Sequence, residues 1–362
     1  SKVGVVVGGG LLGLEAAKAL KDLGLETHVV EFAPRLMAVQ VDDGGGKVLR
    51  KKIAELGVGI HTERNTVEIT DGEKCLHVMK FSDGTSLETD MILFSAGIRP
   101  RDDIARNNGI AVGARGGIVV DNFCRTNAPD VYAIGECALW EGKIYGLVAP
   151  GYQMADVACT HILGGQDKEF LGADMSTKLK LLGVDFASIG DAHGVTAGSI
   201  NYSYVDERTQ TYKKIVVSAD GKKLLGAVLI GDVEAYGDLL QLKLNDMDLP
   251  ANPEALILPS LDGSSKPLLG ADALPMKAVI CSCNNVTKQD LCNAIEGGVT
   301  ELGELKSCTK AATSCGGCAA LVGQVLKCEL TKRGVEVKKD ICEHFAYSRQ
   351  EMYHLAKIGN IR

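Results

Sequence analysis

The spacing of apolar residues at the start of the chain predicts a strand, a helix and a second strand in succession. Val3–Val7 is an apolar run typical of a buried strand, and a glycine cluster follows it. Leu11–Leu23 places apolar residues at helical spacing, and Glu26–Glu31 again has the pattern of a strand. A helix over Val48–Leu56 and a strand over Gly59–Thr62 continue the alternation. The chain therefore opens with a βαβ unit of an α/β domain.

The pattern then changes to short strands separated by turn signals. Asp71-Gly72 and Asp83-Gly84 are hairpin dipeptides within residues 66–96, so we expect a three-stranded meander that ends in the buried strand Met91–Ser95. Further elements are expected as short strands over Gly117–Asp121 and Asp130–Ile134 and as a helix over Pro150–Leu163.

A third region resumes the alternation after Gly172. Asp220-Gly221 marks a hairpin between two apolar strands, and Ala235–Lys243 has the spacing of a short helix, so we predict an α+β module. Five prolines and little periodicity over Leu249–Pro275 predict a linker. The remainder is a cysteine-bearing, mostly helical module. The expected strands of the third region are Lys178–Leu182, Val184–Ile189, Tyr202–Val205, Lys214–Ser218 and Leu224–Ile230.

Composition narrows the function classes. The 362 residues carry a net charge of −7, and only 5% are aromatic, so a nucleic-acid-binding surface is not expected. No apolar run approaches the roughly 18 residues of a membrane span, and the N-terminus has no signal-peptide pattern, so we expect a cytoplasmic protein. Eight of the twelve cysteines lie in the last 87 residues, a clustering that favours a metal site over disulfides.

The glycine cluster after the first strand matches G-x-G-x-x-G. Gly8 would permit a tight turn, Gly10 would let the backbone approach a pyrophosphate, and Gly13 would let the helix pack closely on the strand. Glu31 ends the next strand, where a carboxylate accepts hydrogen bonds from ribose hydroxyls and repels a 2′-phosphate. The motif predicts an NAD site with a preference for NADH, although Arg35 lies nearby and leaves the choice between NADH and NADPH open.

Residues 4–20, the meander and Ile92–Pro100 together resemble the flavin-dependent pyridine-nucleotide oxidoreductases. The resemblance implies a Rossmann-like, three-layer FAD/NAD(P)-binding fold. It also implies that Gly97 lies against the cofactor and that Glu15 lies near the nicotinamide.

Thr126–Glu136 resembles the second flavin motif of the same family. That motif usually ends in Gly-Asp, whereas here it ends in Gly135 and Glu136, which the resemblance places at the ribityl chain. The helix start at 149–153, which includes Pro150, would direct its N–H groups at the isoalloxazine ring. In that family an earlier Rossmann unit binds the ADP half of FAD. The sequence given does not contain that unit, so we expect it to bind FAD poorly or not at all by itself.

Four cysteines form the pattern C-x-C…C-x-x-C: Cys281, Cys283, Cys315 and Cys318. Four thiolates suit a [2Fe–2S] cluster, and they also suit zinc, although the tight C-x-C pair favours the cluster. The spacing resembles the bacterioferritin-associated ferredoxin type of [2Fe–2S] domain. Three further cysteines match no ligand position and are expected to be small buried hydrophobic residues: Cys292, Cys308 and Cys328.

With the stretches Ser176–Asp191 and Ile341–Tyr353, the whole pattern resembles the large subunits of NAD(P)H-dependent assimilatory nitrite reductases. The resemblance implies hydride transfer from NADH to FAD and one-electron transfer to a [2Fe–2S] cluster, with no side chain needed as acid or base. Sirohaem and a [4Fe–4S] cluster belong only to the complete protein. Its acceptor would be a downstream sirohaem module or small subunit. The alternative is a reductase of the same architecture serving a nitrate reductase or a ferredoxin-type partner.

The resemblance also divides the chain. We expect an NAD(P)H-binding domain over 1–99, a second FAD-binding segment over 100–170 and an α+β reductase module over 171–250. A linker over 251–275 leads to a [2Fe–2S] domain over 276–332. Residues 333–362 would begin a further region, in which Cys342 is expected to be either a ligand in the complete protein or, in this chain, a lone thiol. A homodimer is a further expectation.

Overall fold

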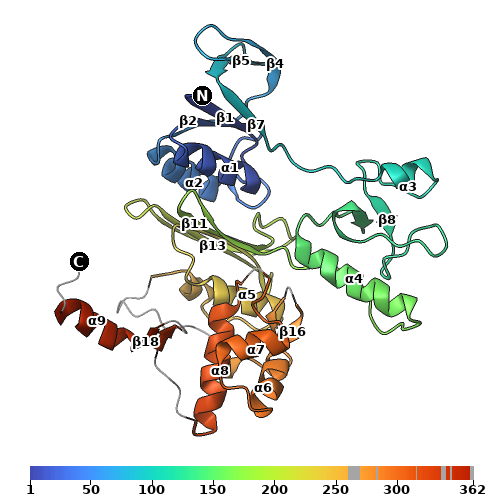
Figure 1. Cartoon of the computed structure of the whole chain (residues 1–362), viewed down its shortest axis with the longest axis vertical. Helices are drawn as coiled ribbons and strands as arrows, with labels where there is room; N and C mark the ends of the chain where they lie inside the picture. Colours follow the sequence, from blue (N-terminus) through green and yellow to red (C-terminus); the bar gives the residue numbers. More distant parts are fainter. Residues whose placement is uncertain (260–269, 283, 315, 336–339, 343–344, 359–362) are drawn as a thin grey trace. The chain divides into compact units, whose positions relative to one another are not determined.

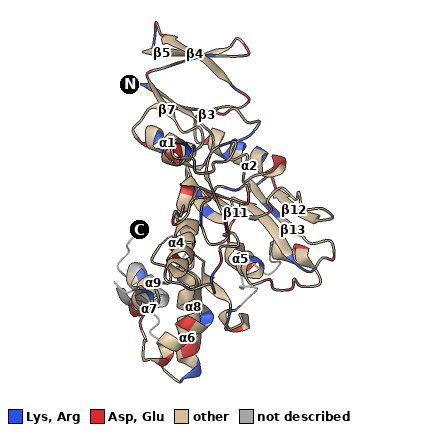
Figure 2. Cartoon of the chain, turned by 90° about the vertical axis from the view of Figure 1, so that its right-hand side faces the viewer, with Lys and Arg blue, Asp and Glu red and all other residues tan. Residues whose placement is uncertain are grey.

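The computed structural model describes residues 1–259, 270–282, 284–314, 316–335, 340–342 and 345–358. It divides into two compact units, Ser1–Leu268 and Leu269–Arg362. In the part of the chain that the structure describes, no helix is long and apolar enough to cross a membrane. Both acidic and basic side chains occur along α2, α5 and α6, as expected for a chain with similar numbers of the two (Figure 2).

The first unit begins with a parallel sheet of order β3-β2-β1-β7, covered by two helices on one face (Figure 1). The apolar runs form the strands, and the two helices α1 and α2 turn their apolar sides to the sheet through Leu14, Leu49 and Ile53, all fully buried. The βαβ prediction is confirmed. The elements are β1 (Val3–Val7), α1 (Leu11–Asp22), β2 (Glu26–Val30), α2 (Asp43–Glu55), β3 (Val58–His61) and β7 (Met91–Phe94).

The predicted meander covers the other face of this sheet, which makes three layers. Its buried Met79 and Phe81 pack against Val5 and Val30 of the parallel sheet. The strands are β4 (Thr66–Asp71), β5 (His77–Phe81) and β6 (Ser86–Thr89), in the order β4-β5-β6.

Two sequence predictions in this region were wrong. The last apolar strand does not end the meander but pairs in parallel with β1, and it is not buried, since the Phe94 side chain is 67% exposed. This strand, β7, lies at the edge of the sheet, where its only neighbour in the sheet order of the described residues is β1. The second helix starts at Asp43, five residues before the predicted Val48, because Asp42 caps it through Gly45 N.

The segment after β7 forms a small layer of its own around buried Cys124, Met154 and Phe170. The expected helix is confirmed, but Asp130–Ile134 is not a strand. It makes only an isolated bridge, between Arg125 and Tyr132, because no neighbouring strand continues the pairing. The elements are α3 (Asp103–Asn107), β8 (Ile118–Val120), the 3-10 turn η1 (Gly135–Cys137), β9 (Ala138–Trp140) and α4 (Val148–Ile162).

The α+β module is an antiparallel sheet of order β10-β11-β14-β13-β12, with α5 packed against it. Its apolar residues Phe186, Val228 and Ile230 join Leu49 and Ile53 of α2 in one core. The module is therefore joined to the nucleotide domain through α2. Its elements are β10 (Thr177–Leu181), β11 (Val184–Gly190), β12 (Ile200–Asp206), β13 (Thr211–Val217), β14 (Leu224–Ile230) and α5 (Tyr236–Leu244).

The second unit is mostly helical, as predicted, and three helices surround the buried residues Leu291, Leu305 and Val322. A capping box formed by Thr287 and Asp290 fixes the start of α6. Within 251–275, the described part contains two 3-10 turns, η2 (Pro253–Leu256) and η3 (Ala271–Ala273). The other elements are β15 (Val279–Cys281), β16 (Val286–Thr287), α6 (Lys288–Glu296), α7 (Leu302–Thr309), α8 (Ala319–Lys332), β17 (Asp340–Cys342), β18 (Phe345–Ser348) and α9 (Arg349–Ile358).

Candidate cofactor sites

The glycine turn joins β1 to α1, and its geometry depends on the absence of side chains. Gly8 has φ +114°, and a Cβ on Gly13 would lie 1.8 Å from the Gly8 carbonyl oxygen. Both positions therefore require glycine. A Cβ on Gly10 would meet nothing within 4 Å, so open space lies beside the N-terminus of α1. The N-cap residue is Gly10, which has no side chain to cap the helix, and this leaves the N-terminus suited to bind the negative charge of a phosphate.

The Glu31 carboxylate lies directly beside this turn. Its Oε2 accepts a hydrogen bond from Gly9 N at 2.5 Å, and its Oε1 accepts one from Ala33 N at 2.7 Å. The segment after β2 also folds onto the turn, since Met37 N donates to Gly9 O at 2.9 Å. An open cradle, a helix N-terminus and a fixed carboxylate fit the diphosphate and ribose of a dinucleotide.

Two other predicted cofactor residues, Glu15 and Gly97, lie near the same sheet. The contacts described for them do not assign either one to a part of the cofactor. Glu15 is on the exposed side of α1, two residues after Gly13. Gly97 follows β7 with φ +82° and open space at its Cβ position. Both remain predicted cofactor residues.

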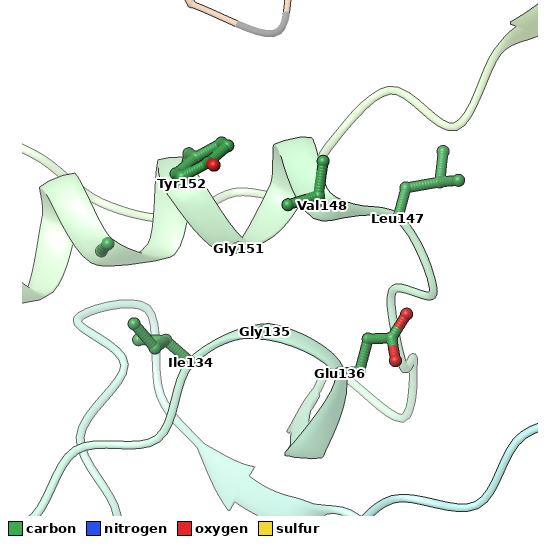
Figure 3. A pocket seen from close by; sticks show the side chains of 8 residues that line it. Ile134, Gly135, Glu136, Leu147, Val148, Gly151 and Tyr152 are labelled. Carbon is green, nitrogen blue, oxygen red and sulfur yellow. The ribbon is translucent and has the colours of Figure 1, made fainter. Parts of the chain in front are cut away.

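A pocket of about 390 Å³ lies between η1 and the start of α4. Figure 3 shows Gly135 facing Gly151, and the two lie close together, since a Cβ on Gly151 would be 3.4 Å from the Gly135 Cα. The pocket has Glu136 at one end, and its other lining residues are Ile134, Gly135, Leu147, Val148, Gly151, Tyr152 and Ala155.

The start of α4 brings backbone N–H groups to this pocket. Leu147 is the N-cap residue and provides no side-chain hydrogen bond, and Pro150 is buried in the first turn. Gly135 N donates to Met154 Sδ at 3.3 Å, which fixes the 3-10 turn against the helix. Apolar walls, one carboxylate and an uncapped helix N-terminus fit a planar, partly polar ring with a hydroxylated chain, the chemistry of a flavin. Of the predicted residues, Gly135 and Glu136 line this pocket, whereas Pro150 lies in the first turn of α4 and does not line it.

Two of the four predicted metal ligands can be placed in the second unit. Cys281 ends β15 and is 2% exposed, and Cys318 is the partly buried N-cap residue of α8. Cys283 and Cys315 lie outside the described residues. Among the described residues, no three His, Cys, Asp or Glu side chains form a group that could hold a metal ion. The thiols of the two described cysteines suit iron or zinc, and Gly316 gives the second loop its φ of +74°.

Asn284, which the sequence analysis did not single out, connects the two cysteine loops. Its Nδ2 donates to Lys310 O at 2.6 Å and lies 3.9 Å from Cys281 Sγ. It also lies 3.2 Å from Ser314 Oγ, just before the second pair. The only signal in the sequence is its place directly after C-x-C.

The remaining cysteines of this unit only partly match their prediction. Cys292 is 1% exposed, and its burial raises the pKa of the thiol, as expected for a small buried residue. Cys308 is exposed, because it lies on the outer side of α7, so its predicted burial was wrong. Cys328 is only partly buried and donates to Asp272 Oδ2 at 2.7 Å, an interaction that raises the pKa of its thiol. The side chain of Cys342 lies outside the described residues.

A network in the first unit was also missed, because it joins residues about 170 positions apart. Asp42 accepts hydrogen bonds from Tyr212 Oη at 2.8 Å and from Lys214 Nζ at 2.9 Å. Burial raises the pKa of the Asp42 carboxyl, but hydrogen bonds from Gly45 N, Lys214 and Tyr212 outweigh it, so the pKa lies below its ordinary value. This network attaches the start of α2 to the α+β module.

Three family models match successive parts of the chain. Residues 1–161 match the pyridine nucleotide-disulphide oxidoreductase model, and residues 176–243 match the rubredoxin NAD+ reductase C-terminal domain. Residues 279–327 match the BFD-like [2Fe-2S] binding domain.

Relatives in the curated proteins include the nitrite reductase [NAD(P)H] large subunit of Klebsiella oxytoca, 63% identical over 359 residues, which are 99% of this chain and 37% of that protein. The nitrite reductase (NADH) large subunit of Escherichia coli is 58% identical over 363 residues, 100% of this chain and 43% of that protein. The chain thus spans about two fifths of the length of these relatives.

Among solved structures, a ferredoxin reductase from Rhodopseudomonas palustris matches with a TM-score of 0.60 and 25% identity, over 73% of this chain and 63% of that one. A pyridine nucleotide-disulphide oxidoreductase from Desulfovibrio vulgaris, at 22% identity and a TM-score of 0.54, covers 90% of this chain and 71% of that one. These structures support the Rossmann-like, three-layer fold of the first unit. With its oxidoreductase, reductase C-terminal and [2Fe–2S]-binding regions in this order, the chain is similar over nearly its whole length to a part of the nitrite reductase [NAD(P)H] large subunits.

Proposed function

We propose that this chain is the electron-entry portion of an NADH-dependent nitrite reductase. In the full-length protein it would pass reducing equivalents from NADH, through FAD and a [2Fe–2S] cluster, toward reduction of nitrite to ammonium at sirohaem. The observation that carries the proposal is that one chain contains both a dinucleotide turn and a four-cysteine module, and that nitrite reductases match it at 63% and 58% identity across both. The cofactors supply hydride acceptance and one-electron transfer, and the protein positions them.

For NADH, we assign binding to residues 1–99. The open space at Gly10 admits the diphosphate, and the uncapped start of α1 provides N–H donors to it. Glu31, held by Gly9 N and Ala33 N, would accept hydrogen bonds from the ribose hydroxyls. Glu15 and Gly97 would lie toward the nicotinamide end.

For FAD, we assign the pocket of residues 100–170. Glu136 would hold the ribityl hydroxyls, one methylene further from the backbone than an aspartate would. The N-terminus of α4, which includes Pro150, would stabilise negative charge on the ring. Val148 is 68% exposed and Tyr152 is 58% exposed, so a flavin in this pocket would cover apolar surface.

For the cluster, we assign the module 276–332 with ligands Cys281, Cys283, Cys315 and Cys318. The burial of Cys281 limits contact with water, and the Asn284 amide beside its sulfur supports a negatively charged thiolate. Electrons would leave toward a downstream sirohaem module or a small subunit. We further propose that the protein acts in the cytoplasm, where thiols stay reduced, and that it forms a homodimer.

The test combines iron, sulfide and zinc analysis of the purified chain with a visible absorption spectrum of the full-length protein before and after anaerobic NADH. The proposal expects about two iron atoms per chain and flavin bands that bleach with NADH. Zinc without iron, or a bound flavin that NADH does not reduce, would contradict it.

A second candidate is a reductase of the same architecture that serves another acceptor. It is favoured by one relative, the assimilatory nitrate reductase electron transfer subunit of Bacillus subtilis, 36% identical over 323 residues, 89% of this chain and 40% of that protein. The full-length protein would then reduce a nitrate reductase or a ferredoxin-type partner with NADH. Nitrite turnover by the full-length protein in the absence of any added partner would exclude this candidate.

A further inference from the structure

The segment between β2 and α2 forms one wall of the proposed NADH site. Besides the two hydrogen bonds that hold Glu31, the Leu36 side chain lies against the glycine turn, since a Cβ on Gly9 would be 2.6 Å from Leu36 Cδ2. Leu36 is buried and Arg35 directly precedes it. Arg35 is thus a cation on the same segment as the carboxylate that would contact the ribose.

The Arg35 guanidinium is held by α2 and by the backbone before it. Its Nη1 forms an ion pair of 2.5 Å with Asp43 Oδ1, and its Nε donates to Val41 O at 2.8 Å. The stem packs on α2, because a Cβ on Gly46 would lie 2.9 Å from Arg35 Cδ. The Arg35 side chain is only 23% exposed, whereas that of Asp43 is 84% exposed.

The backbone that carries these partners is fixed from the other side by the α+β module. Ser188 Oγ donates to Gln40 O at 3.2 Å, and His193 Nε2 lies 2.9 Å from Val39 O. The neighbouring Asp42 is held by Tyr212 and Lys214. The Val41 carbonyl, which accepts from Arg35 Nε, therefore stays in place if the Arg35 side chain turns toward a ligand.

We propose that the Arg35–Asp43 pair selects NADH over NADPH by keeping the guanidinium engaged with α2. This inference rests on the proposed function and deepens it, since it names the residues that set the coenzyme preference. The 2′-phosphate of NADPH would approach the Glu31 carboxylate and be repelled by it. A nearby arginine could compensate this repulsion. Arginine binds phosphate well through its fork of N–H donors, so Arg35 would be such a partner once Asp43 no longer competes for it.

The roles of the two residues differ. Asp43 is a positioning residue, which acts through Arg35 and does not touch the coenzyme. Because Asp43 is exposed, its ion pair is weak, and its removal should change the preference by about fivefold and not by orders of magnitude.

The experiment measures dissociation constants of NADH and NADPH for the 362-residue chain and for three variants. Asp43→Ala should tighten NADPH binding about fivefold and leave NADH binding within about twofold. The double variant Asp43→Ala/Arg35→Ala should lose this gain. Asp22→Ala, which removes a similar exposed ion pair with Lys18 on α1, is the matched control and should leave the NADPH-to-NADH ratio unchanged.

Three results would overturn the inference. The ratio in Asp43→Ala could equal that of the parent chain, the gain could persist without Arg35, or Asp22→Ala could produce the same gain through general surface charge. In each of these cases NADH still binds and the proposed function stands. If the parent chain binds neither dinucleotide, the proposed NADH site fails and the inference fails with it.

Discussion

The glycine turn before α1 and the cysteine loops before α8 both lead into a helix, but they suit their proposed cofactors in opposite ways. The glycine turn depends on the absence of side chains. Gly8 and Gly13 leave no room for a Cβ, and Gly10 leaves space for a ligand. In the cysteine loops the site is made by side chains, of which Cys281 and Cys318 are described. Adding one carbon should therefore damage the first site, whereas removing one sulfur should damage the second.

The two sites also differ in what holds them. The glycine turn is fixed by its own backbone and by Glu31, 22 residues away in sequence. The cysteine loops are joined by the Asn284 side chain, which reaches Lys310 O and Ser314 Oγ. The comparison yields four predictions, given from the largest expected effect to the smallest.

Replacement of Cys281 by serine should remove essentially all cluster iron, because the hydroxyl oxygen is a poor substitute for a thiolate ligand. NADH binding should not change, since the residue lies in the other compact unit. Iron analysis and visible absorption measure the loss. Cys308→Ser is the control, because Cys308 is exposed and matches no ligand position, and it should keep its iron. Equal iron content in both variants would refute the ligand assignment.

Addition of a single methyl group at Gly10 should weaken NADH binding on the order of tenfold or more without loss of stability. Gly10 has φ −81° and open space at its Cβ, so alanine fits the fold but occupies the place of the diphosphate. Gly13→Ala should instead lower the melting temperature as well, since its Cβ would clash with Gly8 O. Gly237→Ala, in helix α5 with open space around it, is the control for both measurements. Unchanged NADH affinity in Gly10→Ala would remove the turn from the site.

Replacement of Lys214 by methionine should lower the free energy of unfolding by about 2 kcal/mol, because it leaves the partly buried Asp42 carboxylate without its cation. Lys180→Met removes an exposed pair with Asp185 and should have little effect. Urea denaturation measures both.

The Lys214 effect should also depend on pH. The pKa of Asp42 lies below its ordinary value of 3.8 in the folded chain, so its contribution is present above that value and is lost as the pH falls through the folded pKa. The stability difference between the parent chain and Lys214→Met should therefore disappear in strong acid. A difference that stays constant from neutral pH into strong acid would contradict the role of Asp42.

Replacement of Asn284 by aspartate should have the smallest effect, a roughly threefold faster loss of the cluster in the presence of a chelator. The change keeps the shape of the side chain but removes the N–H donor to Lys310 O. Asn285→Asp, at the adjacent exposed position, controls for the added charge. The same rate of loss in the two variants would show that the amide does not support the cluster.

Local patterns carried most of the fold prediction. The elements β1, α1 and β2 follow from periodicity over a few residues, and the hairpins follow from Asp-Gly turns. The start of α2 was missed because Gly44–Gly46 are poor helix formers. These glycines are used because a side chain on Gly44 would lie 2.8 Å from the Tyr212 ring, a contact with a distant part of the sequence.

The candidate sites also contain some residues that could be predicted from local sequence and others that depend on distant contacts. Gly8, Gly10, Gly13 and Glu31 could be named from one motif, because that site is built from about 30 consecutive residues. The exposure of β7 and the Asp42–Tyr212–Lys214 network could not be predicted, since both depend on which distant segments are neighbours in the fold. The Arg35–Asp43 pair lies between these cases: both residues are close in sequence, but only the structure shows that they are engaged with each other.

The central claim is that electrons from NADH reach the cysteine module, and the most direct test is an EPR spectrum of the full-length protein frozen after anaerobic NADH. The account predicts the rhombic signal of a reduced [2Fe–2S] cluster, which is absent from Cys281→Ser and weakened in Gly10→Ala at limiting NADH. A cluster that dithionite reduces but NADH does not, in a protein that contains flavin, would contradict the account.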